Sequence, residues 1–145
     1  MSWQLLPHRG IRFGEAEIVV GAPRAKVRQA LAEYFPPPKN QRRESEDQYL
    51  NSDGKIFLRY DDANTLEAIM CIDGSVQLDG LELLNTTWSE LIPHLESRGH
   101  TPEESKYFAN GQDFPELGIN IATREDVGGD EDDDEIEWVS VWRSA

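Results

Sequence analysis

The sequence lacks the features that would place it in several common classes of protein. Its single cysteine, Cys71, cannot form an internal disulfide and leaves no CxxC pair for zinc. No run approaches the roughly 18 apolar residues of a transmembrane helix, and the first 14 residues contain no apolar stretch typical of a secretory signal. We therefore expect a soluble protein of the cytoplasm.

Basic residues are also scarce, and their distribution is uneven. The chain has 14 Lys and Arg against 28 Asp and Glu, a formal net charge of −14 over 145 residues. Residues 1–43 hold eight bases and three acids, whereas residues 44–145 hold six bases and 25 acids. Proteins that bind duplex nucleic acid or anionic lipid usually carry the opposite balance. We therefore expect neither nucleic acid nor membrane among the partners.

The densest negative charge lies near the C-terminus. Nine of the 13 residues 125–137 are Asp or Glu, and none is Lys or Arg. Such a run repels itself and stays solvated, so we predict a mobile loop at 126–135. With Asp126 as the first position, the run partly matches an EF-hand calcium loop, but Gly128 and Glu131 stand where an acid and a glycine are needed. We therefore expect no calcium site and no other cofactor.

Two segments have the apolar spacing of amphipathic helices. The first follows Pro23, which suits a first helical turn, and has its apolar face within 27–34. The second opens at Thr87, which fits a capping box with Glu90, and Gly99 can cap its end.

Strand patterns follow each predicted helix and are separated by turns. We therefore predict an α+β fold in which two helices pack on antiparallel β-meanders, within a single domain of residues 1–145. The predicted strands are 47–50, 55–60 and 65–72 in the first set and 106–108, 117–122 and 136–142 in the second.

The two sets share an order that is typical of an internal duplication, with halves 1–75 and 76–145 that each contain a helix and three strands. An α+β chain rich in hairpins also produces such a pairing by chance, and both interpretations stay open. If the duplication is real, the acidic run is an enlarged version of the hairpin turn at 61–64. The two tips would then be equivalent points on two neighbouring sheets.

No pattern in the sequence indicates a catalytic site. The chain has no GxSxG, no GxGxxG after a strand and no GxxxxGK[ST]. His8, His94 and His100 are scattered, and Cys71 lies in an apolar strand, where a free thiol behaves as a small hydrophobe. We therefore expect no enzyme activity and no metal site.

The last predicted strand carries two tryptophans on one face. Trp138 and Trp142 alternate with Val139 and Val141, so both faces of the strand are apolar. One face packs on the helices, and the other is either buried elsewhere or offered to a partner. Aromatic residues beside a carboxylate-rich loop suit an interface with a basic protein.

We therefore predict that a protein partner binds at the acidic loop and at the tryptophan beside it. The summed field of the loop would speed association, and Trp138, if it faces outward, would slow dissociation as an anchor. The predicted partner-binding residues are Asp126, Asp130, Glu131, Asp132, Asp133, Asp134, Glu135 and Trp138.

Four segments resemble a family of small acidic bacterial proteins: GIRFG, VRQALAEYF, IFLRYDDANTLEAIMCIDG and LDGLELL. Together with the acidic second half, they resemble immunity proteins of polymorphic toxin systems, and the tandem helix-plus-meander plan is similar to the repeat of the β-lactamase-inhibitor-protein fold. The resemblance implies an antitoxin role in bacterial competition. The chain would bind a cognate toxin domain with a basic active-site cleft and occlude it, without chemistry of its own.

Two other functions stay open on the sequence. One is an acidic regulatory or structural interaction domain that has no toxin partner. The other is an enzyme that uses some of the carboxylates, with or without a divalent metal.

Overall fold

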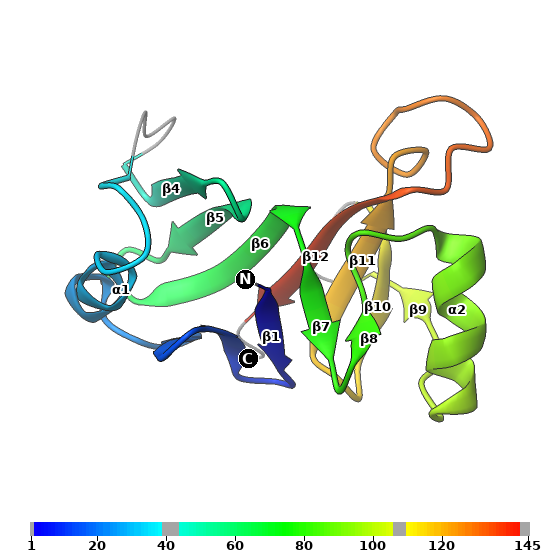
Figure 1. The fold of residues 1–145 in the computed structure, drawn as a ribbon, viewed down its shortest axis with the longest axis horizontal. Coiled ribbons are helices and arrows are strands. Elements are labelled where there is room, and N and C mark those ends of the chain that lie inside the picture. Colours follow the sequence, from blue (N-terminus) through cyan, green and yellow to red (C-terminus); the bar gives the residue numbers. More distant parts are fainter. Residues whose placement is uncertain (1, 39–43, 106–109, 143–145) are drawn as a thin grey trace.

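The fold is mostly β, with two helices and twelve strands in the residues that the structure describes. The structure is a computed structural model that describes residues 2–38, 44–105 and 110–142 (Figure 1). This mixture is consistent with the predicted α+β class, and the strand predicted at 106–108 lies outside the described residues. The helices are α1 (Arg24–Leu31) and α2 (Trp88–Ser97). The strands are β1 (Trp3–Leu6), β2 (Gly10–Phe13), β3 (Ala16–Val19), β4 (Glu46–Asn51), β5 (Gly54–Tyr60), β6 (Leu66–Gly74), β7 (Val76–Leu78), β8 (Leu81–Glu82), β9 (Glu103–Glu104), β10 (Gln112–Phe114), β11 (Ile119–Thr123) and β12 (Ile136–Trp142).

Seven strands form one antiparallel sheet in the order β4-β5-β6-β12-β11-β10-β9. The predicted meander of β4, β5 and β6 is correct, and so are the strands at β11 and β12. The two meanders meet where β6 pairs with β12, which sets Cys71 opposite Val139 and Ile69 opposite Val141. All four of these side chains are buried in the core.

The antiparallel junction of β6 and β12 places the two hairpin tips at opposite ends of one sheet. The turn between β5 and β6 lies at the end where β12 finishes, whereas the acidic loop between β11 and β12 lies where β6 finishes (Figure 1). The expectation of two neighbouring sheets is therefore wrong, because both meanders belong to one sheet, and the antiparallel pairing of β6 with β12 places the two tips at its opposite ends. The internal duplication itself stays a prediction.

A second sheet has the order β3-β2-β1-β7-β8, and sequence analysis did not predict it. Its only parallel pair among the described residues joins β1 to β7, with Trp3 opposite Val76. The hairpin from β7 to β8 turns at Asp79 and Gly80, whose φ values of 47° and 83° are the two positive values that a two-residue type I′ turn requires.

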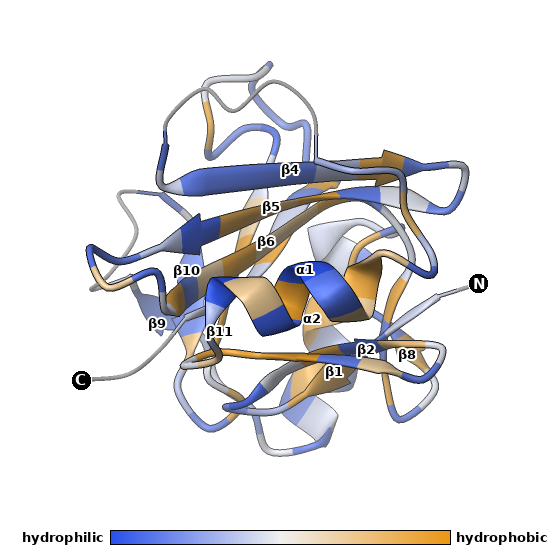
Figure 2. Ribbon diagram, turned by 90° about the vertical axis from the view of Figure 1, so that its left-hand side faces the viewer, coloured by the Kyte–Doolittle hydropathy of each residue, from blue (hydrophilic) through white to orange (hydrophobic). Residues whose placement is uncertain are grey.

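Helix α1 lies between the two sheets and fills part of the core. Figure 2 shows it between the β4–β6 part of the large sheet and the β1–β2 part of the small sheet. Its buried residues are Val27 and Leu31, as the apolar spacing predicts, and the helix ends at Leu31. Beside it, the ring of Trp3 lies 4.5 Å from that of Phe13 and 5.5 Å from that of Phe35, measured between centroids.

Helix α2 begins and ends where the sequence predicts. The Thr87 hydroxyl accepts the backbone N–H of Glu90, so Thr87 is the N-cap. At the other end, Gly99 has a φ of 85° and donates to Glu96 O, while His100 donates to Leu95 O. This pair of bonds is the Schellman arrangement that a glycine just after the helix permits. Neither helix in the described part of the chain is long and apolar enough to cross a membrane.

A buried carboxylate ties α1 to the edge of the large sheet. Asp47, on β4, is fully buried, and its oxygens accept two hydrogen bonds from Arg28, both 2.8 Å long, and two from Arg24, of 2.7 and 3.3 Å. Burial alone would raise the pKa of Asp47, but the bonds from Arg28 and Arg24 outweigh that effect and hold the pKa below its ordinary value.

Candidate functional site

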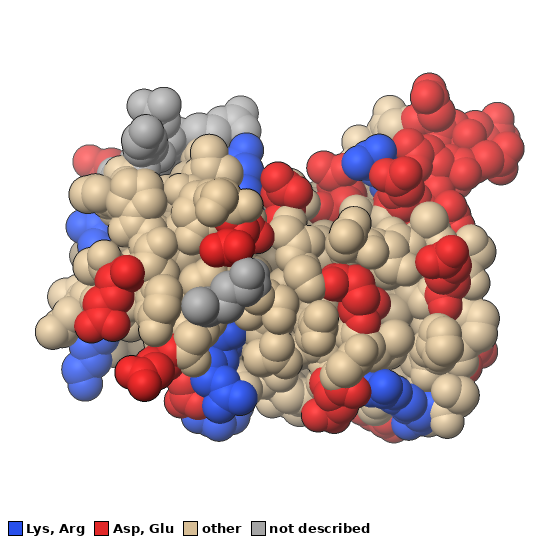
Figure 3. Space-filling view, viewed as in Figure 1, with Lys and Arg blue, Asp and Glu red and all other residues tan. Residues whose placement is uncertain are grey.

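The acidic loop projects from the end of the large sheet on a base that is closed by hydrogen bonds. Figure 3 shows acidic side chains gathered over this projection. Arg124 N donates to Glu135 O over 2.9 Å, and Glu125 N donates to Asp133 O over 3.0 Å, so pairing of the two chain segments continues beyond β11 and β12. Gly129 N then donates to Arg124 O over 2.7 Å. Mobility of the loop stays a prediction, and these bonds restrict it to the tip.

The predicted partner-binding acids divide into two groups. Asp130, Glu131 and Asp132 are exposed, and their side chains form no hydrogen bond or ion pair with any described residue. The others bond within the loop or at its base. The Asp126 carboxylate accepts Thr123 N over 2.9 Å, for example, and the Thr123 hydroxyl accepts Asp126 N over 3.1 Å. We define the acidic tip as residues 130–132.

Asp134 fixes the loop to the N-terminus of α2. One oxygen of its carboxylate accepts both Ser89 N, at 3.0 Å, and the Ser89 hydroxyl, at 2.6 Å, while Asp134 O accepts Trp88 N. The Ser89 hydroxyl and then the Ser89 N–H hold the pKa of Asp134 below its ordinary value. A carboxylate is favourable at a helix N-terminus. This second role was not visible in the sequence, because 45 positions separate the two residues.

Trp138 lies on β12, on the face opposite to the buried Val139 and Val141. It is half-buried, and its indole N–H donates to the side-chain oxygen of Asn120 over 2.7 Å. The Asn120 amide donates in turn to a carboxylate oxygen of Asp113 over 3.0 Å. The polar atom of Trp138 is therefore used within the sheet, and its role as an anchor for a partner stays a prediction.

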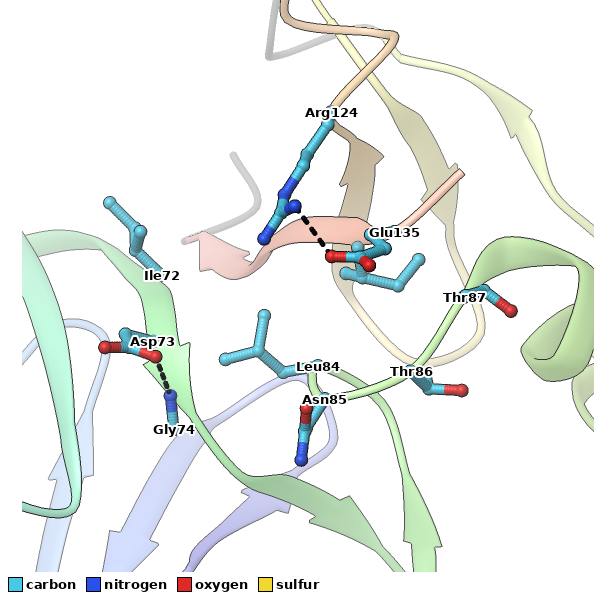
Figure 4. Close-up of a pocket in the computed structure, with 10 residues that line it drawn as sticks. Ile72, Asp73, Gly74, Leu84, Asn85, Thr86, Thr87, Arg124 and Glu135 are labelled. Carbon is cyan, nitrogen blue, oxygen red and sulfur yellow. Dashed lines mark hydrogen bonds and ion pairs between the residues drawn. The ribbon is translucent and has the colours of Figure 1, made fainter. Parts of the chain in front are cut away.

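A polar cavity of about 220 Å³ lies at the foot of the acidic loop. It is bounded by the end of β6, the connection from β8 to α2 and both segments of the loop base, as Figure 4 shows. Sequence analysis missed it, because its walls come from distant parts of the chain, which the β6–β12 junction and the bonds from the loop base to the start of α2 bring together. The residues used below are Ile72, Asp73, Leu84, Asn85, Arg124 and Glu135.

Carboxylates organise two walls of this cavity. The Glu82 carboxylate accepts the backbone N–H groups of Leu84, at 2.9 Å, and Asn85, at 3.0 Å, and thereby shapes the connection to α2. On the loop side, Arg124 forms an ion pair of 2.7 Å with Glu135 (Figure 4). A longer ion pair of 3.8 Å joins Arg124 to Glu137.

The other candidate groups for chemistry are histidines and the single cysteine. His8 and His100, predicted to be scattered, both contact Glu116: His8 Nε2 lies 2.6 Å from its carbonyl oxygen and His100 Nδ1 lies 3.2 Å from its carboxylate. Cys71 is buried as predicted, and burial raises its pKa to about 12. Within residues 2–38, 44–105 and 110–142, no three His, Cys, Asp or Glu side chains are grouped to hold a metal ion.

Comparison with known proteins gives no relative: the chain matches no family model, no curated protein and no solved structure.

Proposed function

We propose that this chain is an immunity protein, which binds a cognate bacterial toxin domain in the cytoplasm and occludes its basic active-site cleft. The acidic tip is the observation that supports the proposal. Asp130, Glu131 and Asp132 form no side-chain contacts with described residues, so their charge is available to a partner. The bonds from Arg124 and Ser89 hold the base of the loop in place beneath them.

The physical basis of the proposal is electrostatic mimicry of a phosphate backbone. An enzyme that acts on nucleic acid has a basic cleft, and closely spaced carboxylates can occupy it. Opposite charge raises the rate of encounter by orders of magnitude at low salt. A loop held at its base also loses less conformational entropy on binding than a free chain does. An inhibitor of a lethal enzyme benefits from both effects.

The proposal includes two further statements. The chain has no catalytic activity of its own. It also consists of two tandem halves, a plan supported by the chain order of the large sheet, in which each half contributes a meander and the third strands, β6 and β12, are neighbours. The alternative of an acidic regulatory domain differs only in its partner, which would be a basic protein that is not toxic.

Two variants of equal charge test the proposal. The tip-neutral variant replaces the three tip residues, and the scattered control replaces three exposed acids elsewhere, so both lose three negative charges. The substitutions are Asp130→Asn, Glu131→Gln and Asp132→Asn in the tip-neutral variant, and Glu33→Gln, Asp62→Asn and Glu96→Gln in the scattered control.

The test is capture of proteins from the native cell, followed by expression of each captured protein in a neutral host. We expect one captured protein to kill the host when expressed alone and to be neutralised when co-expressed with this chain. Neutralisation should weaken with the tip-neutral variant and persist with the scattered control. If the captured proteins are basic but none is toxic, the regulatory alternative is correct. If none binds the purified chain, both functions are wrong.

A further inference from the structure

We propose that the cavity at the foot of the acidic loop receives one cationic side chain, an arginine or a lysine, presented by the basic partner. The inference rests on the proposed function, which supplies the basic partner. The choice of a cationic side chain rests on the residues that line the cavity. The acidic tip would attract the partner over a distance, whereas the cavity would fix its register on the surface.

The lining of the cavity matches the two parts of such a side chain. Ile72 and Leu84 provide apolar surface for the methylene groups of a basic side chain. Asp73 and Glu135 provide carboxylates for its charged end, where charge-assisted hydrogen bonds are strongest. One oxygen of Asp73 accepts Gly74 N over 3.0 Å, and the other has no hydrogen-bond partner among the described residues.

The cavity is already formed in the free chain. Glu82 holds the wall at Leu84 and Asn85 through two backbone hydrogen bonds. The opposite wall is held by Asp134, which bonds Ser89 at the start of α2. A preformed site avoids the ordering cost that a flexible surface would add to binding.

Arg124 indicates which charge the cavity accepts. Its side chain is 51% exposed, and its guanidinium already pairs with Glu135 over 2.7 Å at the rim (Figure 4). The Glu135 carboxylate therefore binds a guanidinium in this geometry. An anion would instead need Arg124, which Glu135 and Glu137 already neutralise. An incoming cation competes with Arg124 for Glu135, and this competition provides a distinctive test.

The experiment uses small probes and the full chain, so it needs no partner. Nα-acetyl-arginine amide is titrated into isotopically labelled protein, and backbone amide shifts are followed by NMR. The control probe is Nα-acetyl-citrulline amide, which has the same shape and no charge. We expect saturable shifts at Gly74, Asn85 and Arg124 with the arginine probe alone. Asp73→Asn and Glu135→Gln should each weaken binding, by about twofold to fivefold for an exposed pair.

Substitution of Arg124 should have the opposite effect on the affinity for the arginine probe. Arg124→Gln should tighten binding of the arginine probe, because it frees Glu135, whereas a site for an anion would bind more weakly. The inference is wrong if the citrulline probe shifts the same amides equally, if the arginine probe shifts only residues 126–135, or if free leucine binds as well as the arginine probe. Each of these results leaves toxin neutralisation untouched, so the two proposals fail separately.

Discussion

At the scale of single residues, Asp47 is a buried charge that pairs with two arginines of α1. Its fully buried carboxylate accepts hydrogen bonds from both Arg24 and Arg28, and Arg24 also lies over the ring of Tyr60, 4.7 Å from its centroid. Removal of one partner from a buried ion pair leaves an uncompensated charge. Asp47 therefore helps to hold α1 in place, together with the buried side chains of Val27 and Leu31.

Replacement of Asp47 by Asn should lower the free energy of unfolding by about 3–5 kcal/mol at neutral pH. The difference in the free energy of unfolding between wild type and variant should become smaller in acid. The pKa of Asp47 is held below its ordinary value of 3.8, so its stabilising effect is complete above that pH and is lost as the pH falls through the lowered pKa. Urea unfolding of wild type and variant at neutral pH, and well below pH 3.8, measures this difference.

Glu17→Gln is the matched control, because Glu17 forms only exposed ion pairs among the described residues, of 3.9 Å with Arg9 and 4.0 Å with Arg12. Its effect should not exceed about 1 kcal/mol. Equal losses for the two variants would show that the buried pair contributes no more than an exposed one.

At the scale of elements, α2 and the acidic loop depend on one another. The helix is capped from its own sequence by Thr87 and from the loop by Asp134. The base of the loop is in turn held by backbone bonds at the start of the helix. Ile136 N donates to Thr86 O, and Trp88 N donates to Asp134 O.

Asp134→Asn should increase amide hydrogen exchange at Ser89, because a neutral side chain accepts the hydrogen bond from the Ser89 N–H more weakly. Asp130→Asn, in the same loop, should leave the Ser89 amide unchanged, since Asp130 has no side-chain partner among the described residues. The wild-type cap should weaken as the pH falls through the lowered pKa of Asp134. Exchange measured by NMR at two pH values tests this prediction. Identical exchange in the two variants would contradict it.

Elements with local signals were predictable from the sequence, and elements with distant partners were not. The caps of α2 lie within a few residues of the helix, and β12 is rich in β-branched and aromatic residues, so both were placed correctly. The strands β1, β2 and β3 were missed, because each has only 4 residues, too few for a clear alternation, and the pairing of β1 with β7 joins positions about 70 apart.

The same distinction applies to the candidate site. Composition alone predicts the acidic tip, since charge density is a local property. The cavity and the second role of Asp134 depend on the pairing of β6 with β12, which reverses one meander against the other. No local pattern of residues encodes that pairing.

At the scale of the whole molecule, the charge is concentrated at one end of the large sheet. The three tip residues add their fields over a range of about 10 Å at 0.1 M salt. Each exposed pair with a partner contributes little, about 0–1 kcal/mol, so the main effect of the tip should be on the rate of association.

The tip-neutral variant should therefore associate more slowly with a basic partner at low salt and show a flatter salt dependence, with nearly unchanged dissociation. The scattered control, with the same net charge, should retain most of the wild-type rate. Stopped-flow kinetics at two salt concentrations compares them. Equal rates for the tip-neutral variant and wild type at low salt would mean that the tip is only a solvated turn.

The closed base of the acidic loop has a consequence for how the protein can diverge. The pairing of Arg124 with Glu135 and of Glu125 with Asp133 ends below the tip, so substitutions at 130–132 disturb no side-chain contact of the described fold. Insertions there cost mainly loop entropy, about 0.6 kcal/mol for each doubling of length. The sequence of the tip can thus change under selection while the sheet that carries it stays constant. A lineage could acquire a new binding preference through a few codons, without refolding the protein.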